Sequence, residues 1–257
     1  VQVEGIDLRV LHFPVEEVFH RFVLHREWEV SEMSFGKYIA LVSQGDRSLV
    51  ALPVFPSRLF RHSSMYVRRG SGLESLAQLR GKRIGIPEWA QTAAVYSRGI
   101  LVHEGGVPLE SVEWHQGGVN DPGRAEKVDV RLPEGVRLVR HADRSLNDLL
   151  VAGEIDSMFS ARPPRHFARE APNKALFGAS DSGAGGGIPE LLPTGAGGEI
   201  VRLFADTCAV EEAWYRKTGI FPIMHVVCIK RETFKANRWI AMNLLTAFEE
   251  AKRRSLA

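Results

Sequence analysis

The stretch Thr218-Gly219-Ile220-Phe221-Pro222-Ile223-Met224-His225 marks a point where the chain turns and enters a buried strand. A Thr-Gly turn and a proline precede a mainly apolar run, 223–229, which predicts a strand covered on both faces. One histidine, His225, lies inside this run. An imidazole is costly to bury without a hydrogen bond, and it titrates near neutrality. His225 is therefore either a satisfied core residue or a side chain that faces a cleft.

Outward from this stretch, predicted strands alternate with predicted helices along most of the chain. The strands are expected at 6–13, 28–30, 49–55, 65–68, 81–87, 112–115, 136–140 and 155–160, and the helices at 15–22, 34–42, 73–79, 91–103, 145–151, 208–217 and near 241–248. This alternation is typical of an α/β fold with mainly parallel sheets covered by helices. Ligands of such sheets bind at the carboxyl ends of strands, near helix N-termini.

Two chain crossings, near residues 53–68 and 218–225, divide the predicted elements into two lobes with a hinge and an inter-lobe cleft. We expect lobe I to comprise residues 1–68 and 222–257, and lobe II to comprise residues 69–221. Residues 178–198 are rich in glycine, serine and proline and predict a flexible loop within lobe II.

The composition narrows the class of protein. The chain has 257 residues and a net charge of +2, which gives no case for binding nucleic acid or an anionic membrane. It contains no apolar run long enough to span a bilayer and no signal-like segment. Its two cysteines, Cys208 and Cys228, lack metal-type spacing, which favours reduced thiols and a cytoplasmic location.

Five segments together resemble the 4,5-dihydroxyphthalate decarboxylase family, within the second type of periplasmic-binding-protein-like domains. They are Phe55-Pro56-Ser57-Arg58-Leu59-Phe60-Arg61-His62-Ser63, Leu79-Arg80-Gly81-Lys82-Arg83-Ile84-Gly85-Ile86-Pro87, Gly117-Gly118 with Pro122-Gly123-Arg124, Gly153-Glu154-Ile155-Asp156, and Thr218 to His225. The resemblance extends over residues 1–257. Relative to the family pattern, the chain starts at the segment 3–8, so we expect lobe I to lack the opening strand and helix.

The resemblance implies a non-oxidative decarboxylation of 4,5-dihydroxyphthalate to protocatechuate and CO2. The ring carbon that bears the carboxylate is protonated, and the hydroxyl para to it stabilises the intermediate. This route needs no electron-sink cofactor, and whether a divalent metal takes part stays open. The alternative is a non-catalytic solute-binding protein of the ABC-transporter type that captures an aromatic carboxylate. In either case the partner is a small molecule, and a homo-oligomer is compatible with the sequence.

Arginine is the expected ligand of the substrate carboxylates because its guanidinium donates two parallel hydrogen bonds. Four arginines lie on predicted loops between elements: Arg58, Arg61, Arg124 and Arg162. Arg61 and Arg162 are favoured by their places beside a chain crossing and at a strand end. Arg58 and Arg124 are assigned mainly by the resemblance.

His62 and His225 are the acid–base candidates because both lie near the two chain crossings. One of them protonates the ring carbon while the other contacts a hydroxyl, and the sequence does not assign which. Glu88 follows a predicted strand and is a candidate acceptor of the phenol proton. Glu32 is a candidate for the same role, or for binding a metal together with a histidine.

The remaining candidates contact the substrate without reacting. Ser34 and Thr92 lie at predicted helix starts, where a hydroxyl and backbone N–H groups either bind an anion or simply cap the helix. Phe60 and Tyr215 are expected to stack on an aromatic ring. The pair Glu211-Glu212 is expected on a solvated helix face rather than in a catalytic pair.

Overall fold

The computed structural model describes residues 3–167 and 198–256 of the chain. Except for Gly198, the predicted loop at 178–198 lies outside these residues. The chain divides into two compact units, Val1–Arg58 with Ile223–Ala257, and Leu59–Pro222. The predicted α/β fold with two lobes and two crossings is confirmed. The first crossing ends at Arg58 rather than at residue 68, because the strand at 65–68 pairs within the sheet of the second unit.

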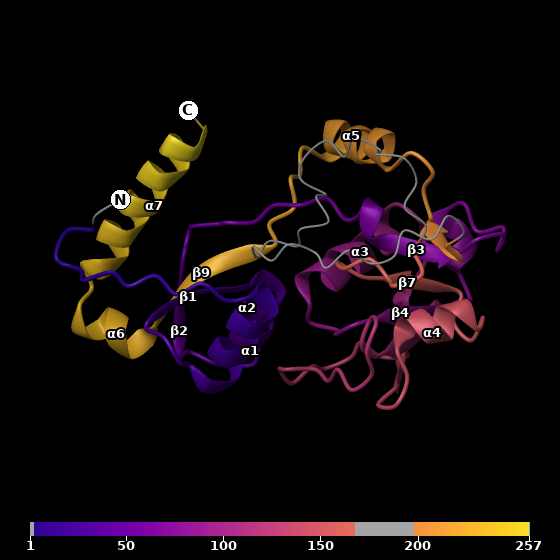
Figure 1. Cartoon of the computed structure of the whole chain (residues 1–257), viewed down its shortest axis with the longest axis horizontal. Coiled ribbons are helices and arrows are strands. Elements are labelled where there is room, and N and C mark those ends of the chain that lie inside the picture. The colour runs from indigo at the N-terminus through magenta and orange to yellow at the C-terminus, as the bar shows by residue number, and fades with distance from the viewer. Residues whose placement is uncertain (1–2, 168–197, 257) are drawn as a thin grey trace. The chain divides into compact units, whose positions relative to one another are not determined.

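The first unit holds a three-stranded sheet in the order β1-β9-β2, in which β9 pairs antiparallel with both neighbours. Its elements are α1 (Val15–His25), β1 (Val30–Ser34), α2 (Phe35–Ser43), β2 (Leu49–Leu52), β9 (His225–Lys230), α6 (Arg231–Ala236) and α7 (Ile240–Leu256). Helices α1 and α2 contact β1, while α6 contacts β9 and β2 (Figure 1). The expectation of a parallel sheet is wrong for this unit, because the returning strand β9 enters between two earlier strands.

The predicted strand at 6–13 is also wrong, since these residues form no ladder with any described strand. Leu8, Val10 and Leu11 in this segment are exposed. Alternating apolar residues favour a strand only where a neighbouring strand accepts the backbone hydrogen bonds and one face is covered.

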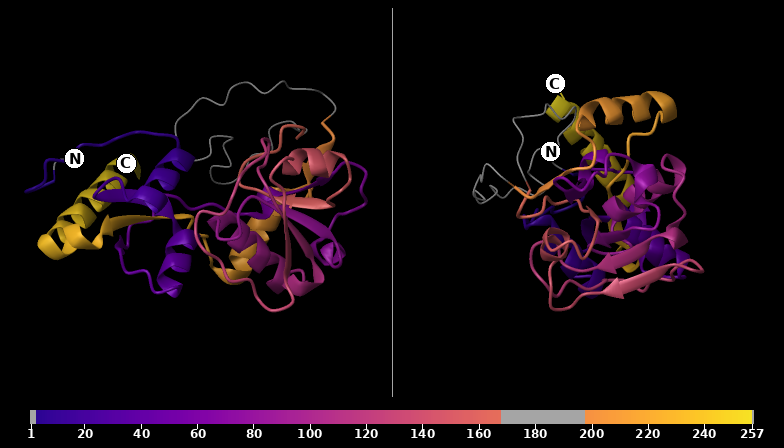
Figure 2. Two further views of the ribbon diagram at one scale, coloured as in Figure 1. Left: turned by 90° about the horizontal axis from the view of Figure 1, so that it is seen from below. Right: turned by 90° about the vertical axis from the view of Figure 1, so that its right-hand side faces the viewer.

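The second unit holds a six-stranded sheet in the order β6-β5-β4-β7-β3-β8. Its elements are η1 (His62–Ser64), β3 (Met65–Arg68), η2 (Leu76–Leu79), β4 (Arg83–Ile86), α3 (Thr92–His103), η3 (Leu109–Ser111), β5 (Glu113–Gln116), β6 (Arg137–Arg140), α4 (Leu146–Val151), β7 (Ser157–Phe159), β8 (Ile200–Arg202) and α5 (Thr207–Thr218). Strands β4 to β7 are parallel, whereas β3 is antiparallel to both β7 and β8. Figure 2 shows the ribbon from two further sides.

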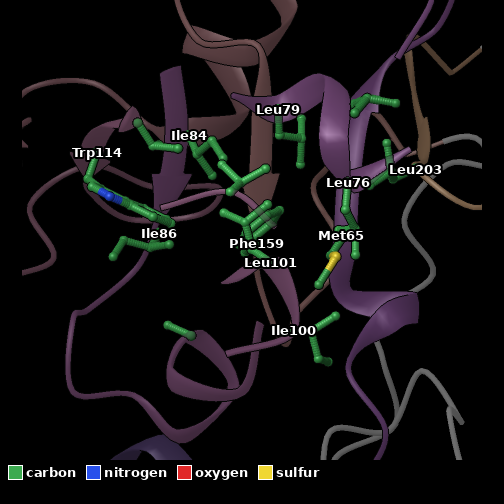
Figure 3. Packing of buried hydrophobic residues seen from close by; sticks show 14 of the residues in the cluster. Met65, Leu76, Leu79, Ile84, Ile86, Ile100, Leu101, Trp114, Phe159 and Leu203 are labelled. Carbon is green, nitrogen blue, oxygen red and sulfur yellow. The ribbon is translucent and has the colours of Figure 1, made fainter. Parts of the chain in front are cut away.

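The main core of the second unit lies where α3 covers this sheet. Ile84 and Ile86 of β4, Trp114 of β5 and Phe159 of β7 meet Leu101 of α3, and all are buried (Figure 3). Burial of each such side chain contributes roughly 1.5–3 kcal/mol. These contacts fix the ends of the strands, from which the predicted site residues extend.

Because β4, β5 and β7 are parallel, their carboxyl ends meet at one edge of the sheet. The predicted site residues Glu88, Thr92, Arg124 and Arg162 follow these ends. Strand β3 begins at the same edge, since the Ser160 amide donates to the Ser64 carbonyl at 2.9 Å. The topology therefore brings the segment with Arg61 to this edge as well.

Candidate active site

The first unit places His225 beside a carboxylate. The Nδ1 atom of His225 lies 2.5 Å from Oε1 of Glu32. In the β1–β9 ladder Ser34 pairs with His225, and Glu32 lies two residues earlier on the same face. The ring of Phe19 contacts the imidazole edge-on at 4.8 Å. The side chains of His225 and Glu32 are 13% and 31% exposed, so the pair is enclosed without being sealed from solvent.

Ser34 and Arg58 lie close to this pair in the chain fold. Ser34 is buried directly before α2, and its hydroxyl makes no capping hydrogen bond to the helix. Arg58 forms a bridge with Ile223, and its guanidinium lies 5.5 Å from the ring centre of Phe55. Both predicted binding residues of the first unit are thus near the start of β9.

Lys37 is a residue that the sequence did not single out. It lies in the first turn of α2, three positions after Ser34, and it is buried. A buried ammonium group at a helix N-terminus is unusual, because the helix dipole there favours anions. The spacing of Ser34 and Lys37 in the run Ser34-Phe35-Gly36-Lys37 indicates this position, since side chains three residues apart lie on one face of a helix.

In the second unit His62 is buried to 2% exposure. Its ring centre lies 5.5 Å from that of Trp214 and 5.9 Å from that of Phe204, and its Nδ1 atom has no hydrogen-bond partner among the described residues. Burial lowers the pKa of His62 to about 4. An imidazole in this setting is neutral near pH 7, so the structure argues against His62 as the proton donor.

Arg61 is also buried, and burial lowers the pKa of its guanidinium to about 10 while Tyr66 and Glu211 oppose this shift. Its Nη1 atom lies 3.4 Å from the hydroxyl of Ser64. It remains cationic at neutral pH, as a carboxylate ligand must.

Glu88 occupies an ion-paired position instead of an open one. It is fully buried, and its Oε1 atom accepts from Nη2 of Arg124 at 2.6 Å and from Nζ of Lys127 at 3.0 Å. Both cations contact the same carboxylate oxygen, so it is already engaged in ion pairs within the second unit. The prediction of Glu88 as a base therefore needs correction: its geometry is that of a residue that holds Arg124 in place.

Thr92 and Arg162 lie at the strand edge as predicted. Thr92 is the first residue of α3 and is buried, and η1, which begins with His62, contacts this helix. Arg162 is exposed, and its amide donates to the hydroxyl of Ser160.

Phe60 and Tyr215, the predicted stacking residues, contact each other with ring centres 6.1 Å apart. Phe60 also stacks on Phe221 at 5.1 Å and meets Trp214 edge-on at 6.1 Å. These aromatic rings join α5 to both linking segments of the second unit. Tyr215 is 49% exposed and keeps a surface toward solvent.

Within residues 3–167 and 198–256, no group of three or more histidine, cysteine, aspartate or glutamate side chains is placed to hold a metal ion. None of the helices in this part of the chain is long and apolar enough to cross a bilayer. What the first unit does offer is a carboxylate–imidazole pair and Arg58, which suits proton transfer to an anionic molecule. The second unit by itself holds Arg61, Arg124 and Arg162.

Comparison with protein-family models gives no match. Among solved structures, the chain is similar to the periplasmic aliphatic sulphonate binding protein SsuA from Escherichia coli (12% identity, TM-score 0.48) and to the alkanesulfonate-binding protein SsuA from Xanthomonas axonopodis pv. citri (12% identity, TM-score 0.47). It covers 60% and 61% of those chains, which align with 93% and 94% of its own length.

Two relatives are far more similar in sequence. The 4,5-dihydroxyphthalate decarboxylase of Comamonas testosteroni is 35% identical over 98% of this chain and 69% of its own length. The 4,5-dihydroxyphthalate decarboxylase of Pseudomonas putida is 37% identical over 72% of each chain. The chain therefore belongs to the 4,5-dihydroxyphthalate decarboxylase family.

Proposed function

We propose that this protein is a carboxy-lyase that converts 4,5-dihydroxyphthalate to protocatechuate and CO2. Membership of the family supports the reaction class. The observation that carries the mechanism is the 2.5 Å contact between His225 and Glu32. A carboxylate beside an imidazole fixes the orientation of the ring, and a general acid must be held in one orientation to deliver its proton.

We assign the proton transfer to Nε2 of His225, because Glu32 engages Nδ1. The imidazolium gives its proton to the ring carbon that bears the departing carboxylate. The ring loses aromaticity, and the oxygen para to that carbon stabilises the resulting quinoid intermediate. When the bond to the carboxylate breaks, its electron pair returns to the ring and CO2 leaves. A proton from solvent then restores the imidazolium.

The anionic groups of the substrate need fixed positive partners. In the first unit Arg58 and the start of α2 at Ser34 are the candidates, since both lie near the start of the strand that begins with His225. In the second unit Arg61 is buried and cationic, and Arg124 is held by Glu88. Bidentate guanidinium groups suit vicinal carboxylates better than a point charge does.

A cytoplasmic location forms part of this proposal. Cys228 is a buried thiol outside any disulfide, and burial raises its pKa to about 12. A thiol in this state is unreactive toward disulfide exchange.

The test is to incubate the purified protein with 4,5-dihydroxyphthalate and to measure CO2 and protocatechuate. We expect equal amounts of the two products and consumption of one proton per turnover. Saturable binding of the substrate without product would overturn the enzyme and support the solute-binding alternative.

A further inference from the structure

Helix α5 carries a buried carboxylate that the sequence assigned to a solvated face. Glu211 is 5% exposed, and its Oε1 atom accepts a hydrogen bond from the backbone amide of Ser63 at 3.1 Å. Its neighbour Glu212 does lie on the outer face, where it pairs with Arg216. The expectation is therefore wrong for Glu211, because the helix turns that residue toward the segment that precedes β3.

The same face of α5 also holds the residues around Arg61. Trp214 lies three positions after Glu211, and its ring meets those of Phe60 and His62 edge-on. Positions three apart share one side of a helix. Phe60 and His62, the chain neighbours of Arg61, thus both contact Trp214 of α5. Glu211 of the same helix binds the backbone of Ser63.

Glu211 and Arg61, both buried, also interact electrostatically. Burial raises the pKa of Glu211, while its hydrogen bond with Ser63 and the charges of Arg202 and Arg61 oppose that change. The carboxylate in turn supports the charge of Arg61 against burial. Each group therefore makes the ionised state of the other less costly in a site with little water.

We propose that Glu211 is a positioning residue, which holds the Ser63 backbone so that the guanidinium of Arg61, two residues earlier, binds a substrate carboxylate. The inference rests on the proposed function, in which Arg61 is a carboxylate ligand of the second unit. Glu211 acts through Arg61 and contacts no reacting atom itself.

The experiment compares Glu211→Ala, Glu211→Gln and the control Glu212→Gln by calorimetric binding of phthalate and of benzoate. We expect Glu211→Ala to weaken phthalate binding about tenfold or more and benzoate binding much less, because benzoate lacks the second carboxylate. Glu211→Gln keeps an acceptor for Ser63 and should fall between the wild type and Glu211→Ala. Glu212→Gln should bind both ligands as the wild type does. Equal weakening of both ligands, or none, would overturn the proposal.

Amide hydrogen exchange at Ser63 gives a readout that needs no turnover. We expect slow exchange in the wild type and in Glu211→Gln, and exchange at least roughly tenfold faster in Glu211→Ala. Wild-type protection in Glu211→Ala would refute the positioning role even if the protein decarboxylates its substrate. Conversely, a protein that shows these effects on phthalate binding but forms no CO2 would refute the proposed reaction alone.

Discussion

At the scale of single residues, His225 and Glu32 form a pair that lies 193 positions apart in the chain. Their contact depends on the register of β1 against β9, which aligns Ser34 with His225. A shift of one residue would turn the glutamate to the opposite face of the sheet. The chemistry of the site is therefore tied to the pairing of two short strands.

His225→Gln should lower kcat roughly 10²- to 10⁴-fold with a small change in KM, because the variant keeps a polar side chain but cannot transfer a proton. Glu32→Gln should lower kcat roughly tenfold, since the amide replaces the carboxylate that orients the ring. Steady-state kinetics of CO2 release check both. Wild-type kcat in His225→Gln would remove this residue from the mechanism.

His62 leads to a prediction about stability instead of catalysis. Its pKa is about 4 in the folded protein and near 6.5 when unfolded, so between these values only the unfolded chain takes up the proton. Stability should therefore fall as the pH drops from about 6.5 to 4, by on the order of 3 kcal/mol in total. Urea unfolding across this range should show a flatter dependence in His62→Phe than in the wild type.

The exposed His103 provides the control for that measurement, and His103→Gln should keep the wild-type slope. An identical pH dependence in His62→Phe and the wild type would show that His62 is not buried in its neutral form. If His62→Phe also retained most of its decarboxylase activity, the assignment of His225 as the sole acid would gain support.

At the scale of elements, Gly85 illustrates how closely β4 packs in the second unit. A Cβ atom at this position would lie 2.8 Å from Cδ1 of Ile155 and 3.1 Å from Cδ2 of Leu146. Gly85→Ala should lower the free energy of unfolding by about 1–3 kcal/mol, because the buried neighbours must shift. Gly99→Ala is the matched control: its Cβ meets nothing within 4 Å, and it should raise stability by about 0.5–1 kcal/mol.

Elements with local signals were predictable from the sequence, whereas those that depend on distant partners were not. Ser145 caps α4 as expected, since its side chain accepts from the amide of Asp148 three positions later. The strand predicted at 6–13 has the right pattern but no ladder. Strand β8 has only three residues and was missed, as was the antiparallel direction of β9, because neither follows from local periodicity.

In the candidate site, too, the residue types were predictable from the sequence, whereas their burial and partners were not. Residue types and loop positions indicated Arg61, Arg124 and His225, while burial decided what each could do. Nothing in the local sequence distinguishes Glu211 from Glu212, yet one is enclosed by the segment before β3 and the other faces solvent. Similarly, the place of Glu88 after a predicted strand indicates an accessible base, whereas the fold pairs its carboxylate with Arg124 and Lys127.

At the scale of the whole molecule, the proposed reaction makes no use of a metal ion. Proton transfer from an imidazolium and charge neutralisation by arginines supply the acid and the anion binding that it needs. We therefore expect full activity after dialysis against EDTA, measured as CO2 release with and without added Mg²⁺ or Zn²⁺. Loss of activity that a divalent cation restores would require a metal in the mechanism.

The central strand of the first unit, β9, has a consequence for how the protein is made. Strands β1 and β2 form no ladder with each other. Each pairs with β9, so neither can form its ladder until residues 225–230 are present. A ribosome completes the whole second unit before it synthesises β9, and domains generally fold as units during translation. The second unit can thus form while the first is still an open chain, so a nascent polypeptide that stalls before His225 would expose two unpaired strands to chaperones and proteases.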